Sequence, residues 1–207
     1  MLELSSHKEA LSRICDEWNK AEDAIKGAES VCSGAPVPAV DMLRCAGGRV
    51  VRAVVAITRG ASPTDVDGLL IDAEFDCYRA QRSAIGAATT QMVENLRSMQ
   101  ERLGHDVVLR VFYEFAAFWR ELSRIHGRVD VSRGDMDDRE ATLTAISDAD
   151  FPALLTRYQE LMASEPLMRE VARRERRRVV ISYGTAGLGI VIGIVGVVLT
   201  IIPMLKP

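Results

Sequence analysis

The chain has 207 residues, of which 48% are hydrophobic, and its 26 lysines and arginines stand against 29 acidic residues for a net charge of −3. Residues 173–207 hold six of the basic residues and one of the acidic ones, so residues 1–172 carry 20 basic and 28 acidic residues. A domain this acidic lacks the net basic face that general nucleic-acid binding needs, so we expect no DNA partner.

Few residues suit catalysis or the binding of a cofactor. The chain has three histidines and four cysteines, and the cysteines do not have the spacing of metal ligands. The sequence contains no glycine-rich phosphate loop and no nucleophile elbow. It therefore predicts neither a metal nor a cofactor, and it favours a protein that is not an enzyme.

The length of residues 1–172 suits one domain, which we expect to be an all-α helical bundle. Apolar residues recur at intervals of three and four from residue 6 to residue 32, which predicts an amphipathic first helix ending at Ser33 and Gly34. A second, valine-rich helix is predicted over residues 38–59. Its three arginines within one narrow arc are Arg44, Arg52 and Arg59.

Ser62 and Pro63 predict the start of a long helix, because serine caps a helix N-terminus and proline suits its first turn. We expect this helix to run to Gly104. Residues spaced alternately by four and three form a heptad pattern along it, which favours coiled-coil packing within the chain or between two chains. The positions of this pattern are Ile71, Phe75, Tyr78, Arg82, Ile85, Thr89, Met92, Leu96, Met99 and Leu103.

A fourth helix, predicted around residues 106–126, is rich in aromatic residues. Five aromatic residues within eight positions do not all fit on one side of a helix, so we expect one or two of them at a partner surface. A loop is predicted over residues 127–138, followed by short helices, one of them capped by Asp150. The last helix is predicted to begin near Pro166. The five aromatic residues are Phe112, Tyr113, Phe115, Phe118 and Trp119.

The strongest signal is the uncharged stretch of 27 residues from 179 to 205. As a helix it would be about 40 Å long, enough to cross a hydrocarbon core of ~30 Å with some tilt. We predict a single C-terminal transmembrane helix, preceded by a basic juxtamembrane segment at residues 173–178. Basic residues are retained on the cytoplasmic side and attract anionic headgroups, so residues 1–172 are expected in the cytoplasm. The arginines expected at the membrane surface are Arg173, Arg174, Arg176, Arg177 and Arg178.

Small residues recur along the predicted transmembrane helix. Small side chains let two membrane helices approach closely, and such packing drives their association in lipid. We therefore expect a homo-oligomer with one contact in the membrane. The candidate residues for this contact are Thr185, Gly189, Gly193, Gly196 and Thr200.

Arg120 and His126 bound the segment Arg-Glu-Leu-Ser-Arg-Ile-His. This segment resembles the arginine–histidine signature of HEPN ribonucleases, which are all-helical domains that pair to form one RNA-cleaving site. The resemblance implies that Arg120 holds phosphate and that His126 acts as general acid or base. The polar residue usual after the arginine is here Glu121. The alternative interpretation is a histidine on the surface of a helix.

Residues 11–19 read Leu-Ser-Arg-Ile-Cys-Asp-Glu-Trp-Asn. They resemble the third homology motif of the B-cell-lymphoma family of apoptosis regulators, in which helical apolar residues enter a groove and an aspartate pairs with an arginine. His7 departs from that motif at its first apolar position, and the alternative is an ordinary amphipathic helix. The resemblance implies a protein partner bound through Leu11, Ile14, Asp16 and Trp18.

The function predicted from these features is that of a tail-anchored membrane protein that self-associates and acts as a scaffold or as a membrane-perturbing, pore-type effector. An apoptosis regulator and a membrane-tethered HEPN-like ribonuclease are the alternatives that the two resemblances imply.

Overall fold

A computed structural model describes residues 6–131 and 143–177. Within these two ranges the regular secondary structure is helical, without a strand, which confirms the predicted all-α helical bundle. The predicted transmembrane helix, residues 179–205, lies outside the described residues. Among the residues that are described, no helix combines the length and the apolar character needed to cross a membrane.

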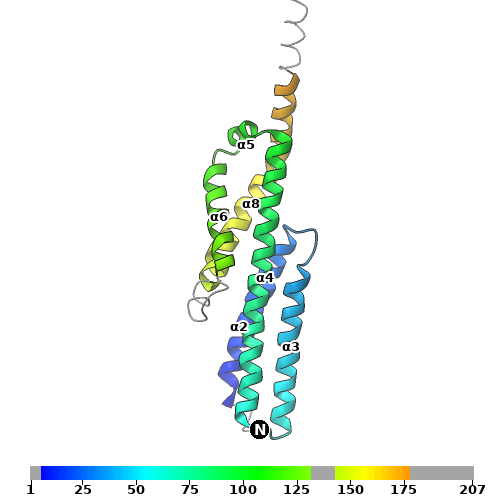
Figure 1. Ribbon diagram of the computed structural model, residues 1–207, viewed down its shortest axis with the longest axis vertical. Helices are drawn as coiled ribbons and strands as arrows, with labels where there is room; N and C mark the ends of the chain where they lie inside the picture. Colours follow the sequence, from blue (N-terminus) through cyan, green and yellow to red (C-terminus); the bar gives the residue numbers. More distant parts are fainter. Residues whose placement is uncertain (1–5, 132–142, 178–207) are drawn as a thin grey trace, which may run out of the picture.

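Helices α2 (Lys8–Glu29), α3 (Val37–Thr58) and α4 (Pro63–Leu103) form a three-helix bundle in the lower half of Figure 1. Contacts between side chains fix the directions of the helices. His7 Nδ1 lies 3.0 Å from Asp67 Oδ1 and Arg13 Nε lies 3.2 Å from Glu74 Oε1, so α2 and α4 run parallel. Helix α3 lies between them in the sequence and runs antiparallel to both.

The sequence explains where these helices begin and end. The Ser62 side chain accepts a hydrogen bond from the Asp65 backbone N–H at 3.2 Å, which satisfies a donor that has no partner within the helix. Gly60 and Gly104, which follow α3 and α4, have φ values of 71° and 91° that glycine adopts without strain. The three helices match the predicted ranges to within a few residues, as expected for helix ends.

Alanine dominates the interface of this lower bundle, where ten alanines of α2, α3 and α4 are buried. The predicted heptad side does not pack within the chain in this part of α4, because Ile71 and Phe75 are 60% and 36% exposed. Pairing of this side with a second chain stays a prediction. Alanine side chains let the helices pack closely, and they fix a different side of α4 as the core. The side of α4 that faces α2 and α3 carries Val66, Leu70, Ala73, Cys77, Ala80 and Ala84.

The upper half of α4 packs against a second group of helices (Figure 1). These helices are α5 (His105–Val111), α6 (Phe115–Val131), the π-helical turn η1 (Ile146–Asp150) and α8 (Phe151–Ala163). Helix α4 is thus shared by two bundles. Here the heptad positions are buried, namely Ile85, Thr89, Met92, Leu96 and Met99.

The predicted fourth helix is two helices, which corrects the prediction for residues 106–126. The chain leaves the helical conformation at Phe112, with φ −120° and ψ 85°, and resumes it at Phe115. This break rotates the aromatic side chains relative to one another, so Phe115 and Phe118 are buried while Tyr113 is 84% exposed. It also lets α6 continue to Val131, into the range predicted as a loop.

Asp150 does not cap α8 as predicted, because its side chain makes no capping hydrogen bond. Its Oδ2 atom accepts hydrogen bonds from Arg124 at 3.1 Å and from Arg128 at 2.9 Å. The π-helical turn before α8 leads directly into it, so the start of α8 has no break that needs a cap. Asp150 instead joins the end of η1 to α6.

Candidate functional site

The C-terminal end of α8 is followed at once by a further helical segment, residues 165–177, which contains most of the predicted basic segment. The turn between them is a single residue, Ser164, whose hydroxyl donates to the Leu161 carbonyl at 2.6 Å and whose own carbonyl accepts from the Met168 N–H at 3.1 Å. Met168 is fully buried. No flexible linker therefore separates the bundle from the start of the basic segment.

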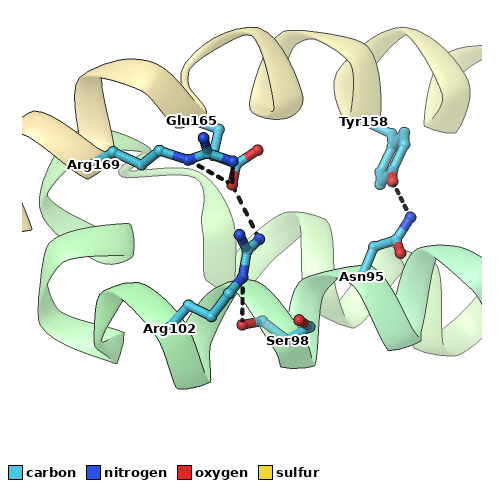
Figure 2. A network of polar contacts seen from close by, with 6 residues as sticks. All are labelled: Asn95, Ser98, Arg102, Tyr158, Glu165 and Arg169. Atoms are coloured by element: carbon cyan, nitrogen blue, oxygen red, sulfur yellow. Dashed lines mark hydrogen bonds and ion pairs between the residues drawn. The ribbon is translucent and has the colours of Figure 1, made fainter.

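Glu165 is the centre of a polar network that fixes this segment to the upper end of α4 (Figure 2). Its Oε1 atom accepts hydrogen bonds from Arg102 Nη2 at 3.0 Å and from Arg169 Nη2 at 2.9 Å. The Glu165 side chain is 13% exposed, so this charge-assisted contact is largely shielded from water. One carboxylate thus joins two arginines from different helices.

A second contact in Figure 2 fixes α8 to α4 through Tyr158, seven residues before Glu165. Asn95 Nδ2 on α4 donates to the Tyr158 hydroxyl at 2.7 Å, and Gln91 Nε2 donates to Asn95 Oδ1 at 3.0 Å. Burial raises the pKa of the Tyr158 hydroxyl above its usual range. The tyrosine therefore stays neutral and keeps its hydrogen bond across the physiological pH range.

The basic segment itself contacts the end of α4. Arg176 Nη2 donates to the Arg102 carbonyl at 2.9 Å. The last carbonyls of a helix have no partner within the helix and carry the negative end of its dipole, so a guanidinium group is stabilised there. Two ion pairs hold neighbouring positions, one between Arg110 of α5 and Glu175 and the other between Arg174 and Glu170.

The arginines predicted at the membrane surface therefore fall into two groups. All four described arginines are exposed, and Arg174 and Arg176 also make the contacts just described, which Arg173 and Arg177 do not share. Arg178 lies outside the described residues, as do Thr185, Gly189, Gly193, Gly196 and Thr200 of the predicted membrane contact.

The structure does not bring Arg120 and His126 together on one face of α6. Arg120 is exposed, and its Nε donates to the Ala116 carbonyl at 3.3 Å in its own helix. His126 is half-buried, with Nδ1 3.2 Å from Thr89 Oγ1 on α4. Six residues along a helix correspond to about 120° around its axis, so the two side chains point in different directions. A ribonuclease site formed by these residues stays a prediction.

The residues of the groove-binding resemblance lie on α2 within the lower bundle. Ile14 is buried, Leu11 and Trp18 are partly buried against the core, and Asp16 is exposed. The Trp18 ring lies beside Gly47 of α3, where a Cβ atom would meet it at 3.4 Å. This burial is that of an ordinary amphipathic helix. A groove partner for this helix stays a prediction that would require α2 to leave the bundle.

Sequence reasoning missed the residues that join α4 to α8 and to the helical segment after it. These residues are Glu165, Arg102, Asn95 and Tyr158. Glu165 and Arg169 have the spacing of an i, i+4 helix pair, which is a recognisable local signal. The partners on α4 are more than sixty positions away, and nothing in the sequence pairs them. Within the described residues, no group of three or more histidine, cysteine or acidic side chains could hold a metal ion.

The chain matches no protein-family model, no curated protein and no solved structure, so its function is argued from its own residues.

Proposed function

We propose that this chain is a tail-anchored membrane protein whose cytoplasmic helical bundle self-associates and acts as a scaffold or as a membrane-perturbing, pore-type effector. The observation that carries the proposal is the continuity between the bundle and the segment leading to the predicted anchor. Residues 165–177 are helical and are fixed to α4, and the 27 uncharged residues from 179 to 205 follow almost at once.

This continuity supports a mechanical link between the bundle and the membrane. A flexible linker would let the bundle tumble independently of its anchor, because Gly/Ser-rich linkers behave as random coils. Here Glu165 and Arg176 fix the segment to the same end of α4. A change in how bundles pack against one another is then expected to rotate or tilt the anchor, and this is how we propose that the protein perturbs or organises a bilayer.

The charges of the segment support a position at an anionic surface. Arg173 and Arg177 are exposed, and a basic residue near such a surface contributes about 1 kcal/mol of attraction. Arg174 and Arg176 already donate hydrogen bonds within the protein, so their guanidinium groups have fewer donors left for lipid headgroups. Among the described arginines we therefore assign the headgroup contact to Arg173 and Arg177, and Arg178 stays a predicted member of the same surface.

The test is to compare the full chain with a chain that ends at residue 178, both expressed in a bacterial host. The full chain should stay in the membrane fraction after alkaline carbonate extraction and form cross-linked oligomers there, whereas the shortened chain should be released. Protease added to sealed right-side-out cells should leave residues 1–172 intact. Release of the full chain by carbonate, or digestion of the bundle from outside, would reject the anchor or its direction.

Replacing Glu165 with alanine tests the link itself. We expect trypsin to cut the exposed Arg173 and Arg177 about tenfold faster or more in this variant, because a hydrogen bond to a charged group contributes about 1.5–3 kcal/mol and a factor of ten corresponds to about 1.4 kcal/mol. The rate is measured on inverted membranes by mass spectrometry of the released peptides. Glu160→Ala, on the exposed side of α8, is the matched control, and trypsin should cut this variant at the wild-type rate. Equal rates in the two variants would show that Glu165 does not hold the segment.

A further inference from the structure

The outward side of α3 is an uncovered apolar and basic surface. Val51 and Val55 are 63% and 39% exposed there. Gly48 lies beside them, and a Cβ atom at this position would meet nothing within 4 Å. Glycine in a helix interior is unfavourable relative to alanine, and packing within this chain does not require Gly48. Two exposed arginines, Arg52 and Arg59, border the valines. We call these five residues the α3 outer face.

The outward side of α4 in the lower bundle is an exposed apolar and acidic surface, with the Arg79 guanidinium 5.9 Å from the centroid of the Phe75 ring at its upper edge. Ile71 and Phe75 are 60% and 36% exposed, and they are the two heptad positions of α4 that are exposed, whereas the others are buried or partly buried. Carboxylates border them on both sides. Asp67 and Asp72 are 56% and 60% exposed even though they contact His7 and Arg49 within the chain. We call the set of Ile71, Phe75 and the exposed carboxylates Asp65, Asp67 and Asp72 the α4 outer face.

The two faces lie at the same height along the bundle. Arg49 on α3 contacts both Asp72 and Asp76 on α4, at 3.0 Å and 3.2 Å, and this sets the antiparallel register of the two helices. Both helices rise about 1.5 Å per residue and run antiparallel, so moving one residue forward along α4 corresponds to moving one residue backward along α3. In this register Ile71 is level with Arg52, and Phe75 is level with Gly48.

We infer that the α3 outer face of one copy of this chain docks against the α4 outer face of a second copy. Phe75 of the second copy then lies over Gly48, where the missing side chain leaves room for an aromatic ring. Ile71 of the second copy lies beside Val51. The arginines of the first copy meet the carboxylates of the second. This inference rests on the self-association in the proposed function and names the surface that performs it.

Charge complementarity is what selects a second copy as the partner. The α3 outer face is basic and the α4 outer face is acidic, so each is matched by the other and neither is matched by itself. Opposite potentials across an interface favour the correct partner and orientation. One pair of like charges falls at the upper edge, where Arg44 is level with Arg79. Each has a carboxylate within its own chain, Asp41 at 4.0 Å and Asp76 at 3.7 Å.

The equal height of the two faces has a geometric consequence for a membrane protein. Copies joined through two different faces form rings or open chains of subunits. When the faces are level, neighbouring copies are related by a rotation about the long axis of the bundle. The segments that lead to the membrane then all emerge at the same end, as one bilayer requires. Dimers joined by two α3 faces in antiparallel fashion would point the segments in opposite directions.

The experiment uses two full-length variants that each damage one face, Val51→Glu and Ile71→Glu. The matched control is Leu167→Glu, which changes an aliphatic residue 55% exposed on neither face. Mass photometry in detergent should show that each face variant alone loses at least tenfold in the population of oligomers, while the control keeps the wild-type population. An equal mixture of the two face variants should form dimers and nothing larger, because each supplies the face that the other lacks.

A cross-link locates the contact. A Gly48→Cys chain mixed with a Phe75→Cys chain should form a disulfide-linked dimer under mild oxidation, above the background that the exposed Cys15 and Cys45 give in unmodified chains. Wild-type oligomers in both face variants would overturn the inference and leave the proposed self-association standing. Loss in Val51→Glu with no effect of Ile71→Glu would overturn it in favour of two α3 faces. A wild-type chain that is monomeric in membranes would reject the proposed function as well.

Discussion

Replacing Phe118 with alanine is expected to lower the free energy of unfolding by about 3–5 kcal/mol, the usual cost of removing a buried phenylalanine side chain. Phe118 is 1% exposed, and its ring meets the Phe112 ring edge-on at a centroid distance of 6.5 Å. It lies where α6 packs on the upper half of α4. The large cost arises because removing the ring leaves a cavity that the surrounding helices fill incompletely.

Chemical denaturation followed by circular dichroism measures this change in the full chain in detergent. Tyr113→Ala removes an aromatic side chain that is 84% exposed, so it should change the free energy by less than about 0.5 kcal/mol and serves as the control. Similar losses for the two substitutions would contradict the assignment of Phe118 to the core and of Tyr113 to the surface.

The aromatic residues show what the sequence could and could not predict in this region. Their crowding already indicated that they do not share one side of a single helix. In the structure a break in the helix at Phe112 separates these side chains, and the sequence does not mark this break with glycine or proline. The break is favourable because it buries Phe115 and Phe118 together, and that gain depends on the position of α4. A local pattern does not contain it.

The heptad positions on α4 are buried within the chain in one half of the helix and exposed in the other, for a physical reason. From Ile85 to Met99 large apolar side chains set the buried side, as the pattern expects. In the lower half two surfaces of α4 compete, one with Ile71 and Phe75 and one built on alanine. The alanine surface is buried because α2 and α3 also present alanines, which allows close packing. Hydrophobicity alone favours the larger residues and so selects the side that stays exposed within this chain.

The link between the bundle and the basic segment was the least predictable feature. The sequence correctly placed the start of a helix near Pro166, and residues 165–177 are helical. The contacts of Glu165 and Arg176 with Arg102 join positions 63 and 74 residues apart. They follow from the length of α4, which extends beyond the lower bundle and meets the segment at its own C-terminal end (Figure 1).

Replacing Arg49 with methionine is the second change expected to be costly, because it removes a partner of a buried carboxylate. Asp76 is 3% exposed, and Arg49 Nε lies 3.2 Å from its Oδ2 atom. The next cation, Arg79, is 3.7 Å from Oδ1. Removing one member of a buried ion pair costs about 3–5 kcal/mol, since the charge that stays is not solvated. We expect a loss of free energy of unfolding in the lower part of this range, because Arg79 compensates in part.

A double variant distinguishes two contributions to the free energy of unfolding. One is the cost of leaving Asp76 buried without Arg49, and the other is the net stabilisation by the ion pair itself. Replacing Arg49 with methionine and Asp76 with leucine together should recover most of the stability, because an apolar pair of similar volume is often as stable as the buried ions it replaces. Asp72→Ala is the control, since its side chain is 60% exposed and its contact with Arg49 should contribute below about 1 kcal/mol. Stability lost in the double variant as fully as in Arg49→Met would mean that the arginine stem, and not the charge of Asp76, holds α3 to α4. The register of the two outer faces would then depend on packing alone.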